Sequence, residues 1–111
     1  MCNRILLVDD FEPWRVYLRS LLQSRPELKV VGEAIDGLDA VEKARELLPD
    51  VILMDISMPR LNGIEAAERI RAIAPQSKIL FVSVEQSADF TEAAIAAGAK
   101  GFIPKTEVET K

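Results

Sequence analysis

Short apolar stretches alternate along the chain with longer stretches of helical pattern. Each interval of about 22 to 27 residues matches the length of one strand–helix unit, and the apolar stretches begin near Arg4, Lys29, Val51, Lys78 and Lys100. The runs Ile5–Val8, Val51–Met54 and Ile79–Val82 are apolar throughout, which is typical of strands that helices cover on both faces. The alternation therefore predicts an α/β fold with a doubly wound, five-stranded parallel sheet between two helical layers.

The intervals between the predicted strands carry recognisable helix boundaries. A first helix is predicted to begin at Pro13 and to end before Pro26. Its apolar face is made of Trp14, Leu18, Leu21 and Leu22. A third begins at Asn62, which Glu65 follows three positions later as in a capping box. A fourth ends at Gly98, a residue suited to a left-handed cap. These signals predict four helices between five strands.

The last residues predict the beginning of one more helix. Thr106–Glu109 has the pattern of a capping box, but the sequence ends at Lys111, after little more than one turn. We therefore expect a single domain over residues 1–111 in which the fifth helix is truncated. A sheet without its last helix leaves apolar surface uncovered, so the sequence also predicts self-association, with a homodimer as one form, or a partner on that face.

The net charge and the cysteine and histidine counts exclude several kinds of function for this chain. A net charge of −4 over 111 residues argues against direct binding of nucleic acid or of an anionic membrane surface. Cys2 is the only cysteine, so an internal disulfide and a multi-cysteine zinc site are excluded. The chain has no histidine, which removes imidazole bases and ligands. Short apolar runs and no evident signal peptide predict a cytoplasmic protein with no membrane span.

Polar side chains follow four of the predicted strands. Asp9 and Asp10 come directly after the first, and Asp55 after the third. Ser83 ends the fourth apolar run, and Lys105 follows the fifth. Carboxyl ends of parallel strands meet at one edge of a sheet, so these side chains should share a crevice. Three carboxylates there repel one another unless a cation lies among them, which predicts a divalent-metal and phosphate site.

Each residue of this set also has an ordinary structural reading. An acidic pair at a strand end can cap a helix, and Asp55 before Met58-Pro59 can form a turn. Ser83 alone can be a loop serine, Lys105 a surface lysine and Phe102 a core residue. The functional interpretation depends on the whole set, because four polar groups follow separate parallel strands.

The ordered set resembles the receiver domain of bacterial two-component response regulators, the CheY-like superfamily. The resemblance covers the chain up to the beginning of the fifth helix. It lies in the motifs Asp9-Asp10, Met54-Asp55-Ile56-Ser57-Met58-Pro59, Asn62-Gly63, Ser83, Gly98-Ala99-Lys100-Gly101-Phe102 and Lys105. It implies a flavodoxin-like sheet with strand order 2-1-3-4-5.

The resemblance also implies a role for each site residue. Asp55 is expected to accept a phosphoryl group from the phosphohistidine of a sensor histidine kinase or a histidine phosphotransfer protein. Mg²⁺ is expected to bind Asp10 directly, Asp9 through water, Asp55, and the main-chain carbonyl of Ser57. Ser83 and Lys105 are then expected to contact phosphoryl oxygens, and Ser83 and Phe102 to act as the switch residues.

Three positions depart from the pattern that the family most often shows. Phe102 stands where tyrosine is frequent, so it has no hydroxyl to donate. Pro104 precedes Lys105 and Thr106 follows it, whereas the family often has proline directly after the lysine. Ser83 replaces threonine, keeping the hydroxyl and losing one methyl group.

The resulting interpretation is a phosphorylation-dependent signalling switch rather than a metabolic enzyme. The stretch Ala96–Phe102, with no proline after Lys105, resembles regulators that carry a C-terminal helix-turn-helix domain. An output in transcription regulation is therefore expected, with DNA bound only through a domain outside this sequence. The surface expected to change on phosphorylation includes the fourth helix and the fifth strand.

Three other functions were weighed against this interpretation. A phosphatase of the haloacid-dehalogenase type expects an aspartate at position 57, where this chain has Ser57. A flavodoxin-like flavin-binding module expects a Ser/Thr/Gly-rich loop in place of Asp9-Asp10-Phe11-Glu12-Pro13. A degenerate receiver that only binds partners would not need the complete set of Asp9, Asp10, Asp55, Ser83 and Lys105.

Overall fold

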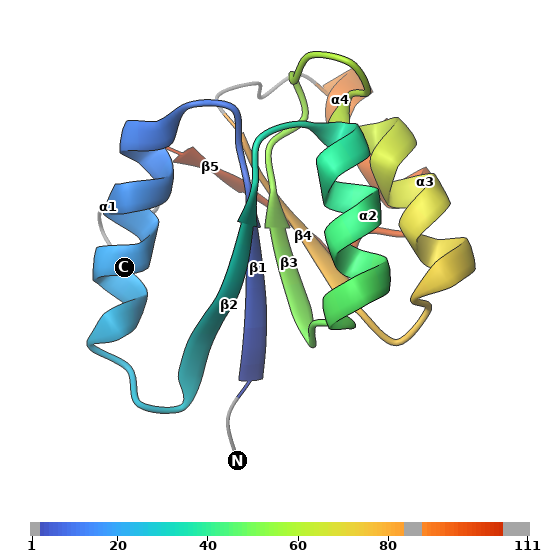
Figure 1. Ribbon diagram of the computed structural model, residues 1–111. Helices are drawn as coiled ribbons and strands as arrows, with labels where there is room; N and C mark the ends of the chain where they lie inside the picture. The colour runs from blue at the N-terminus through green and yellow to red at the C-terminus, as the bar shows by residue number, and fades with distance from the viewer. Residues whose placement is uncertain (1–2, 84–87, 106–111) are drawn as a thin grey trace.

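The computed structural model describes residues 3–83 and 88–105, with no account of the side chains of residues 88–90. Its centre is one five-stranded parallel sheet with strand order β2-β1-β3-β4-β5 (Figure 1). The strands are β1 (Asn3–Val8), β2 (Leu28–Ala34), β3 (Val51–Met54), β4 (Lys78–Ser83) and β5 (Gly101–Pro104). The predicted fold class and strand order are thereby confirmed.

Four helices connect the strands and cover the sheet from both sides. They are α1 (Glu12–Gln23), α2 (Gly37–Leu47), α3 (Gly63–Ile73) and α4 (Ala88–Ala96). α1 lies on one face, and α2, α3 and α4 lie on the other (Figure 1). The expected beginning of a fifth helix at Thr106 lies outside the described residues. No helix in the described ranges is long and apolar enough to cross a membrane.

Alternating side chains of the strands divide the core into two clusters. The larger lies between the sheet and the layer of α2, α3 and α4, and its strand residues include Leu6, Val8, Ile52, Met54, Ile79 and Phe81. The smaller lies under α1 and contains Ile5, Leu7 and Leu18, with Trp14 and Leu22 packed against it. Trp14, Leu18 and Leu22 follow the four-residue spacing of one helical stripe. Leu21, which was expected on the same face, is 40% exposed because it lies beside that stripe.

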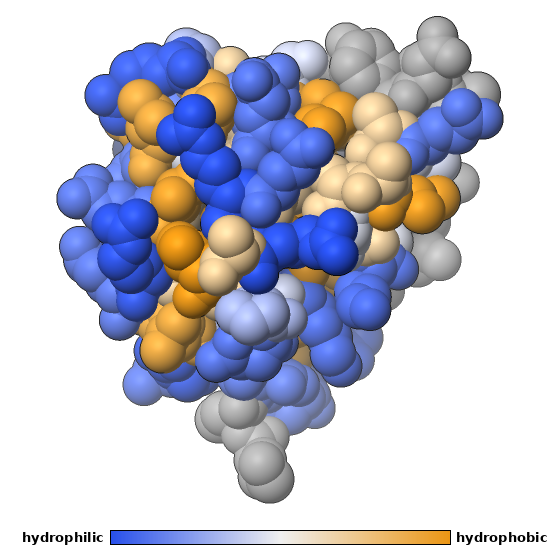
Figure 2. Space-filling view, turned by 90° about the vertical axis from the view of Figure 1, so that its right-hand side faces the viewer, coloured by the Kyte–Doolittle hydropathy of each residue, from blue (hydrophilic) through white to orange (hydrophobic). Residues whose placement is uncertain are grey.

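The outer surface of the α2–α4 layer is mostly hydrophilic. Figure 2 shows this side of the molecule, where a narrow strip of apolar residues runs between hydrophilic ones. Leu38 on α2 and Ile95 on α4 are 40% and 64% exposed. Single exposed apolar residues of this kind are normal on a soluble domain and need no functional explanation.

Two caps fix the loops that lead into α2 and α3. Asn62 accepts a hydrogen bond from the main-chain N–H of Glu65 at 2.9 Å, which confirms the predicted helix start. Asp36 does the same for α2 by accepting from the N–H of Asp39 at 2.8 Å. Arg60, at φ 66°, donates from Nε to Asp36 Oδ2 at 2.7 Å. This ion pair ties the loop after β3 to the loop after β2.

Gly63 permits a close approach between α3 and the end of β3. A Cβ atom at this position would lie 2.1 Å from the main-chain oxygen of Asp55. The N–H of Gly63 also donates to the carbonyl of Ile56 at 2.7 Å. Only glycine allows α3 to begin so close to the strand end that carries Asp55.

Asp36 provides a test of how this loop is stabilised. Asp36→Ala should lower the free energy of unfolding by about 1 to 2 kcal/mol, because it removes an N-cap and the partner of Arg60. Asp36→Asn keeps a capping oxygen and loses only the charge.

The Arg60 hydrogen bond holds the pKa of Asp36 below its ordinary value of 3.8. The deficit of Asp36→Asn should therefore be full above that pH and shrink as pH falls further. Urea unfolding from pH 7 to pH 3 measures it, and a pH-independent deficit would contradict the ion-pair explanation.

The self-association expected from the sequence stays a prediction. Leu80 and Ile103 lie on the α1 side of the sheet, since Phe81 and Phe102 beside them pack into the larger cluster. Both are only partly buried, and of the described helices α1 alone lies on that side (Figure 1). Sedimentation velocity of the 111-residue chain should show dimers at tens of micromolar. Ile103→Gln should reduce them, whereas Leu38→Gln on α2 should not. A single monomeric species at all concentrations would refute this.

Candidate metal and phosphate site

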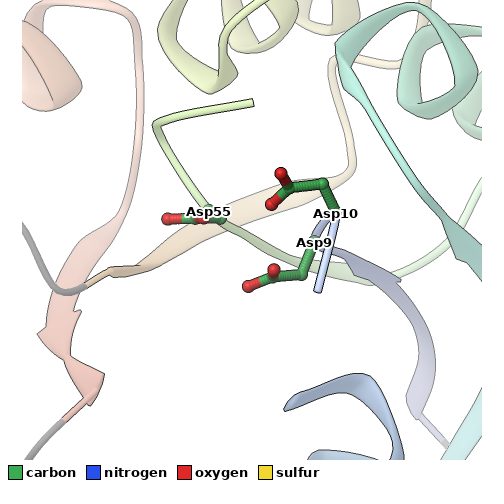
Figure 3. Close-up of side chains that lie close together, drawn as sticks. All are labelled: Asp9, Asp10 and Asp55. Atoms are coloured by element: carbon green, nitrogen blue, oxygen red, sulfur yellow. The ribbon is translucent and has the colours of Figure 1, made fainter. Parts of the chain in front are cut away.

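Three carboxylates lie together at the carboxyl edge of the sheet. One carboxylate oxygen from each of Asp9, Asp10 and Asp55 lies within 4.8 Å of the others. Figure 3 shows the three side chains leaving the ends of β1 and β3 with their carboxylates turned toward a common space. Parallel pairing produces this meeting, because Val8 lies opposite Met54 in the register of β1 and β3. The convergence predicted from the sequence is therefore present.

The main chain fixes the positions of Asp9 and Asp55. The N–H of Asp55 donates to the carbonyl of Val8 at 3.0 Å, and that of Asp9 to the carbonyl of Ala34 at 3.1 Å. Asp9 Oδ1 accepts from the N–H of Phe11 at 2.9 Å. Asp9 and Asp55 are 2% and 7% exposed, whereas Asp10 is exposed. Two acids are thus buried and held, and the third faces solvent.

Lys105 supplies the positive charge next to these acids. Its Nζ lies 2.7 Å from Asp9 Oδ2 and 3.9 Å from Asp55 Oδ2, and the lysine side chain is only 14% exposed. Buried charges of one sign need a partner of the other sign to be tolerated. In this structure Lys105 contacts Asp9 more closely than Asp55, whereas the resemblance predicted a contact with phosphoryl oxygens.

Arg15 is a site residue that the sequence analysis missed. Its Nη1 donates to the main-chain carbonyl of Asp9 at 2.6 Å, and its Nε to Glu33 Oε1 at 2.9 Å. Arg19 contacts the second oxygen of Glu33. Arg15 is 9% exposed, so this buried guanidinium supports the Asp9 main chain from α1. The sequence signal that could have identified Arg15 is its place between Trp14 and Leu18, where a charged residue lies beside the apolar face of the first helix.

Burial changes the acidity of Asp55. Loss of solvent raises the pKa of its carboxyl above the ordinary value of 3.8, and the charge of Asp9 raises it further. Lys105 and hydrogen bonds from Ser83 and the N–H of Ile56 oppose these effects. A carboxylate destabilised in this way gains from any cation that enters beside it.

Ser83 and Phe102 lie on the neighbouring strands β4 and β5. Ser83 is fully buried at the end of β4, opposite Pro104 of β5. Phe102 lies opposite Phe81 in the register and packs against the larger core cluster. The predicted phosphoryl-sensing hydroxyl thus contacts Asp55, and the predicted switch aromatic has an inward position. Ser57 is exposed in the loop after β3, two residues beyond Asp55.

The donor set fits a small divalent cation. Carboxylate oxygens are the hard ligands that Mg²⁺ prefers, and this ion commonly takes one or two carboxylates and keeps several waters. Both oxygens of Asp9 already accept hydrogen bonds from protein donors, whereas Asp10 is exposed. Of these two acids, Asp10 is therefore the more accessible to an entering ion.

Comparison with known proteins gives the same fold and a family. Residues 5–111 match the response regulator receiver domain. The protein-glutamate methylesterase/protein-glutamine glutaminase of Thermotoga maritima is 52% identical over 103 residues, which make up 92% of this chain and 30% of that protein. The response regulator domain of Thermotoga maritima CheB is 48% identical with a TM-score of 0.89, and the match covers 95% of this chain and 79% of that one.

A LuxR-family response regulator from Aurantimonas sp. SI85-9A1 is 38% identical with a TM-score of 0.91, and the match covers 96% of this chain and 76% of that one. A doubly wound sheet with acids and a lysine at its carboxyl edge defines a class of small α/β signalling domains. The chain belongs to the response regulator receiver domain family of two-component systems. It spans only about a third of the length of the methylesterase relative.

Asp55→Asn tests the electrostatic description of the site. In metal-free buffer at pH 7 the variant should have a higher free energy of unfolding than the wild type, because it removes a charge that burial and Asp9 disfavour. The gain should shrink as pH falls through the raised pKa of Asp55 toward 3.8, and it should be absent below that ordinary value, where Asp55 is neutral in both states. Mg²⁺ should stabilise the wild type more than the variant.

Urea unfolding with EDTA or with Mg²⁺ measures both effects. Asp50→Asn is the matched control, because Asp50 precedes the opposite end of β3 and accepts from the N–H of Arg4 at 2.7 Å. That variant should show neither effect. A less stable Asp55→Asn in metal-free buffer would show that the charge of Asp55 is well accommodated.

Proposed function

We propose that this domain is a phosphorylatable switch in which Asp55 accepts a phosphoryl group. The observation that carries the proposal is the meeting of Asp9, Asp10 and Asp55 within 4.8 Å at one strand edge, with Lys105 beside them. The donor would be a phosphohistidine of a sensor histidine kinase or a histidine phosphotransfer protein. The printed sequence has no histidine, so the phosphohistidine would lie outside these 111 residues.

The transfer requires Asp55 to attack an anionic phosphorus atom. An Asp55 carboxylate oxygen forms the new bond to phosphorus while the bond from phosphorus to the imidazole nitrogen breaks, and that nitrogen keeps the electron pair. The N–H of Ile56 donates to Asp55 Oδ1 at 2.8 Å, which orients the carboxylate and leaves its other oxygen on the side of Lys105. Lys105 Nζ, 3.9 Å from that other oxygen, attracts the incoming group.

Mg²⁺ is the proposed cofactor, held by Asp10, Asp55 and the main-chain carbonyl of Ser57, and by Asp9 through water. When bound, it would screen the charge of the phosphoryl oxygens and of the acids. The exposure of Asp10 supports its role as a direct ligand. The Asp9 carboxylate accepts hydrogen bonds from Phe11 and Lys105. These would hold it away from direct contact with the ion, so that a water lies between them.

The response to phosphorylation would begin at Ser83 and Lys105. A phosphoryl group carries about two negative charges and attracts a hydroxyl donor and an ammonium. Ser83 already contacts Asp55 and ends β4 opposite Pro104 of β5, two residues along that strand from Phe102. A movement of Ser83 and Phe102 would alter the surface over α4 and β5. The product is then a conformation, so the domain catalyses only its own phosphorylation and dephosphorylation.

The output belongs to another part of the signalling system. The stretch Ala96–Phe102, and the similarity to a LuxR-family regulator at 38% identity, support transcription regulation through a separate DNA-binding domain. The 52% identity to a protein-glutamate methylesterase/protein-glutamine glutaminase supports a second candidate, in which the receiver controls an enzyme of that kind. In both cases the receiver would act in the cytoplasm, as a monomer or a homodimer.

Incubation with acetyl phosphate and Mg²⁺, followed by intact-mass measurement, tests the proposed phosphorylation. The wild type should gain about 80 Da, the mass of one phosphoryl group. EDTA and Asp55→Asn should each abolish the gain, whereas Asp50→Asn should keep it. An unchanged wild-type mass, or a gain that persists in Asp55→Asn, would contradict Asp55 as the acceptor and favour a receiver that only binds partners.

A further inference from the structure

The ammonium group of Lys105 has an aromatic neighbour as well as its acidic ones. Lys105 Nζ lies 4.9 Å from the centroid of the Trp14 ring. It also lies 2.7 Å from Asp9 Oδ2 and 3.9 Å from Asp55 Oδ2. Trp14 belongs to the first turn of α1, and Lys105 follows β5. One nitrogen atom is thus held between two buried carboxylates and the face of an indole ring.

The indole ring is held in place by its own surroundings. The main-chain N–H of Trp14 donates to the carbonyl of Phe11 at 3.1 Å, which anchors the first turn of α1. The ring lies 5.3 Å from the ring of Tyr17 at an interplanar angle of 36°. It also packs against the cluster of Ile5, Leu7 and Leu18 under α1. The ring is therefore a fixed surface against which the flexible Lys105 side chain can rest.

An indole face suits this position better than a polar side chain would. Tryptophan is the best aromatic partner for an ammonium ion, and the attraction is largest where water is excluded. The Lys105 side chain is 14% exposed. The ring attracts the cation but accepts no strong hydrogen bond from it, so all three N–H groups stay available for oxygen atoms. A carboxylate in its place would compete with the phosphoryl group for those N–H groups.

We propose that Trp14 is a positioning residue for Lys105. It holds the ammonium at the site, between Asp9 and Asp55, so that a phosphoryl group on Asp55 meets a cation that is already in place. The ammonium then moves from Asp9 toward the phosphoryl oxygens while the ring continues to exclude water from its other side. The effect on phosphoryl binding rests on the proposed function, whereas the contact with Lys105 does not.

Binding of beryllium fluoride, a phosphoryl mimic, tests the consequence. Calorimetric titration of BeF₃⁻ in the presence of Mg²⁺ should show Trp14→Leu binding about threefold to tenfold more weakly than the wild type, as expected for a partly buried cation–π contact. Trp14→Phe keeps an aromatic face and should stay within about threefold. Leu22→Ala removes apolar packing two turns further along α1 and should bind like the wild type.

A double substitution separates positioning from general packing. In the Lys105→Met background, Trp14→Leu should cause no further loss of BeF₃⁻ affinity, because the ring acts through the ammonium. The inference would be overturned if Trp14→Leu lowered the BeF₃⁻ affinity equally with Lys105 present and with Lys105→Met. It would also be overturned if the single variant Trp14→Leu bound BeF₃⁻ as tightly as the wild type. A loss in Leu22→Ala as large as that in Trp14→Leu would also overturn it.

Fluorescence in metal-free buffer tests the contact independently of phosphorylation. Trp14 is the only tryptophan, so its emission reports one environment. Lys105→Met should shift the emission maximum by several nanometres, because a charge close to the ring is removed. Arg25→Met, a charge change at the other end of α1, should leave the maximum unchanged. Identical spectra of wild type and Lys105→Met would overturn the contact. If wild-type protein binds no BeF₃⁻ but the shift occurs, the proposed function fails while the contact stands.

Discussion

The balance between buried negative charge and one ammonium group determines how the carboxyl edge of this sheet is built. Asp9 and Asp55 are almost fully buried, and two carboxylates so close would repel each other strongly without a cation. Lys105, which is 96 residues further along the chain than Asp9, supplies the positive charge that offsets this repulsion. A parallel sheet with β1 and β3 adjacent is what brings these residues together. The order of the strands is therefore a requirement of the site as well as of the core.

The fold could be predicted because its signals are local and periodic. Continuous apolar runs identified the strands, and the spacing between them required right-handed crossovers and a parallel sheet. The site followed from the same argument, since residues that directly follow parallel strands must meet at one edge. Their place after a strand put Asp9, Asp55 and Lys105 at that edge, but the strand order that makes β1 and β3 neighbours came from the resemblance to receiver domains. The start of α3 at Asn62 was equally local, because a cap and its helix are neighbours in sequence.

The contacts that sequence reasoning missed depend on how helices are rotated and how loops meet. Arg15 reaches the carbonyl of Asp9 only because α1 turns that face toward the end of β1. Arg60 meets Asp36 across 24 residues of chain, and neither residue carries a local signal for the other. Leu21 was expected on the buried face of the first helix and is exposed because it lies beside the stripe of Trp14, Leu18 and Leu22. Tertiary geometry decides such details, and hydrophobic periodicity does not encode it.

The position of Lys105 also bears on how the proposed phosphorylation would act on the rest of the domain. Its nitrogen lies among Asp9, Asp55 and the Trp14 ring, and no one of these contacts satisfies all its hydrogen-bonding capacity. New negative charge on the Asp55 side therefore shifts a balance that already exists, instead of breaking a rigid ion pair. Because Lys105 directly follows β5 and Ser83 ends the neighbouring β4, the proposed shift would act on two adjacent strands. A site that is nearly balanced before phosphorylation needs only a modest change in charge to move them.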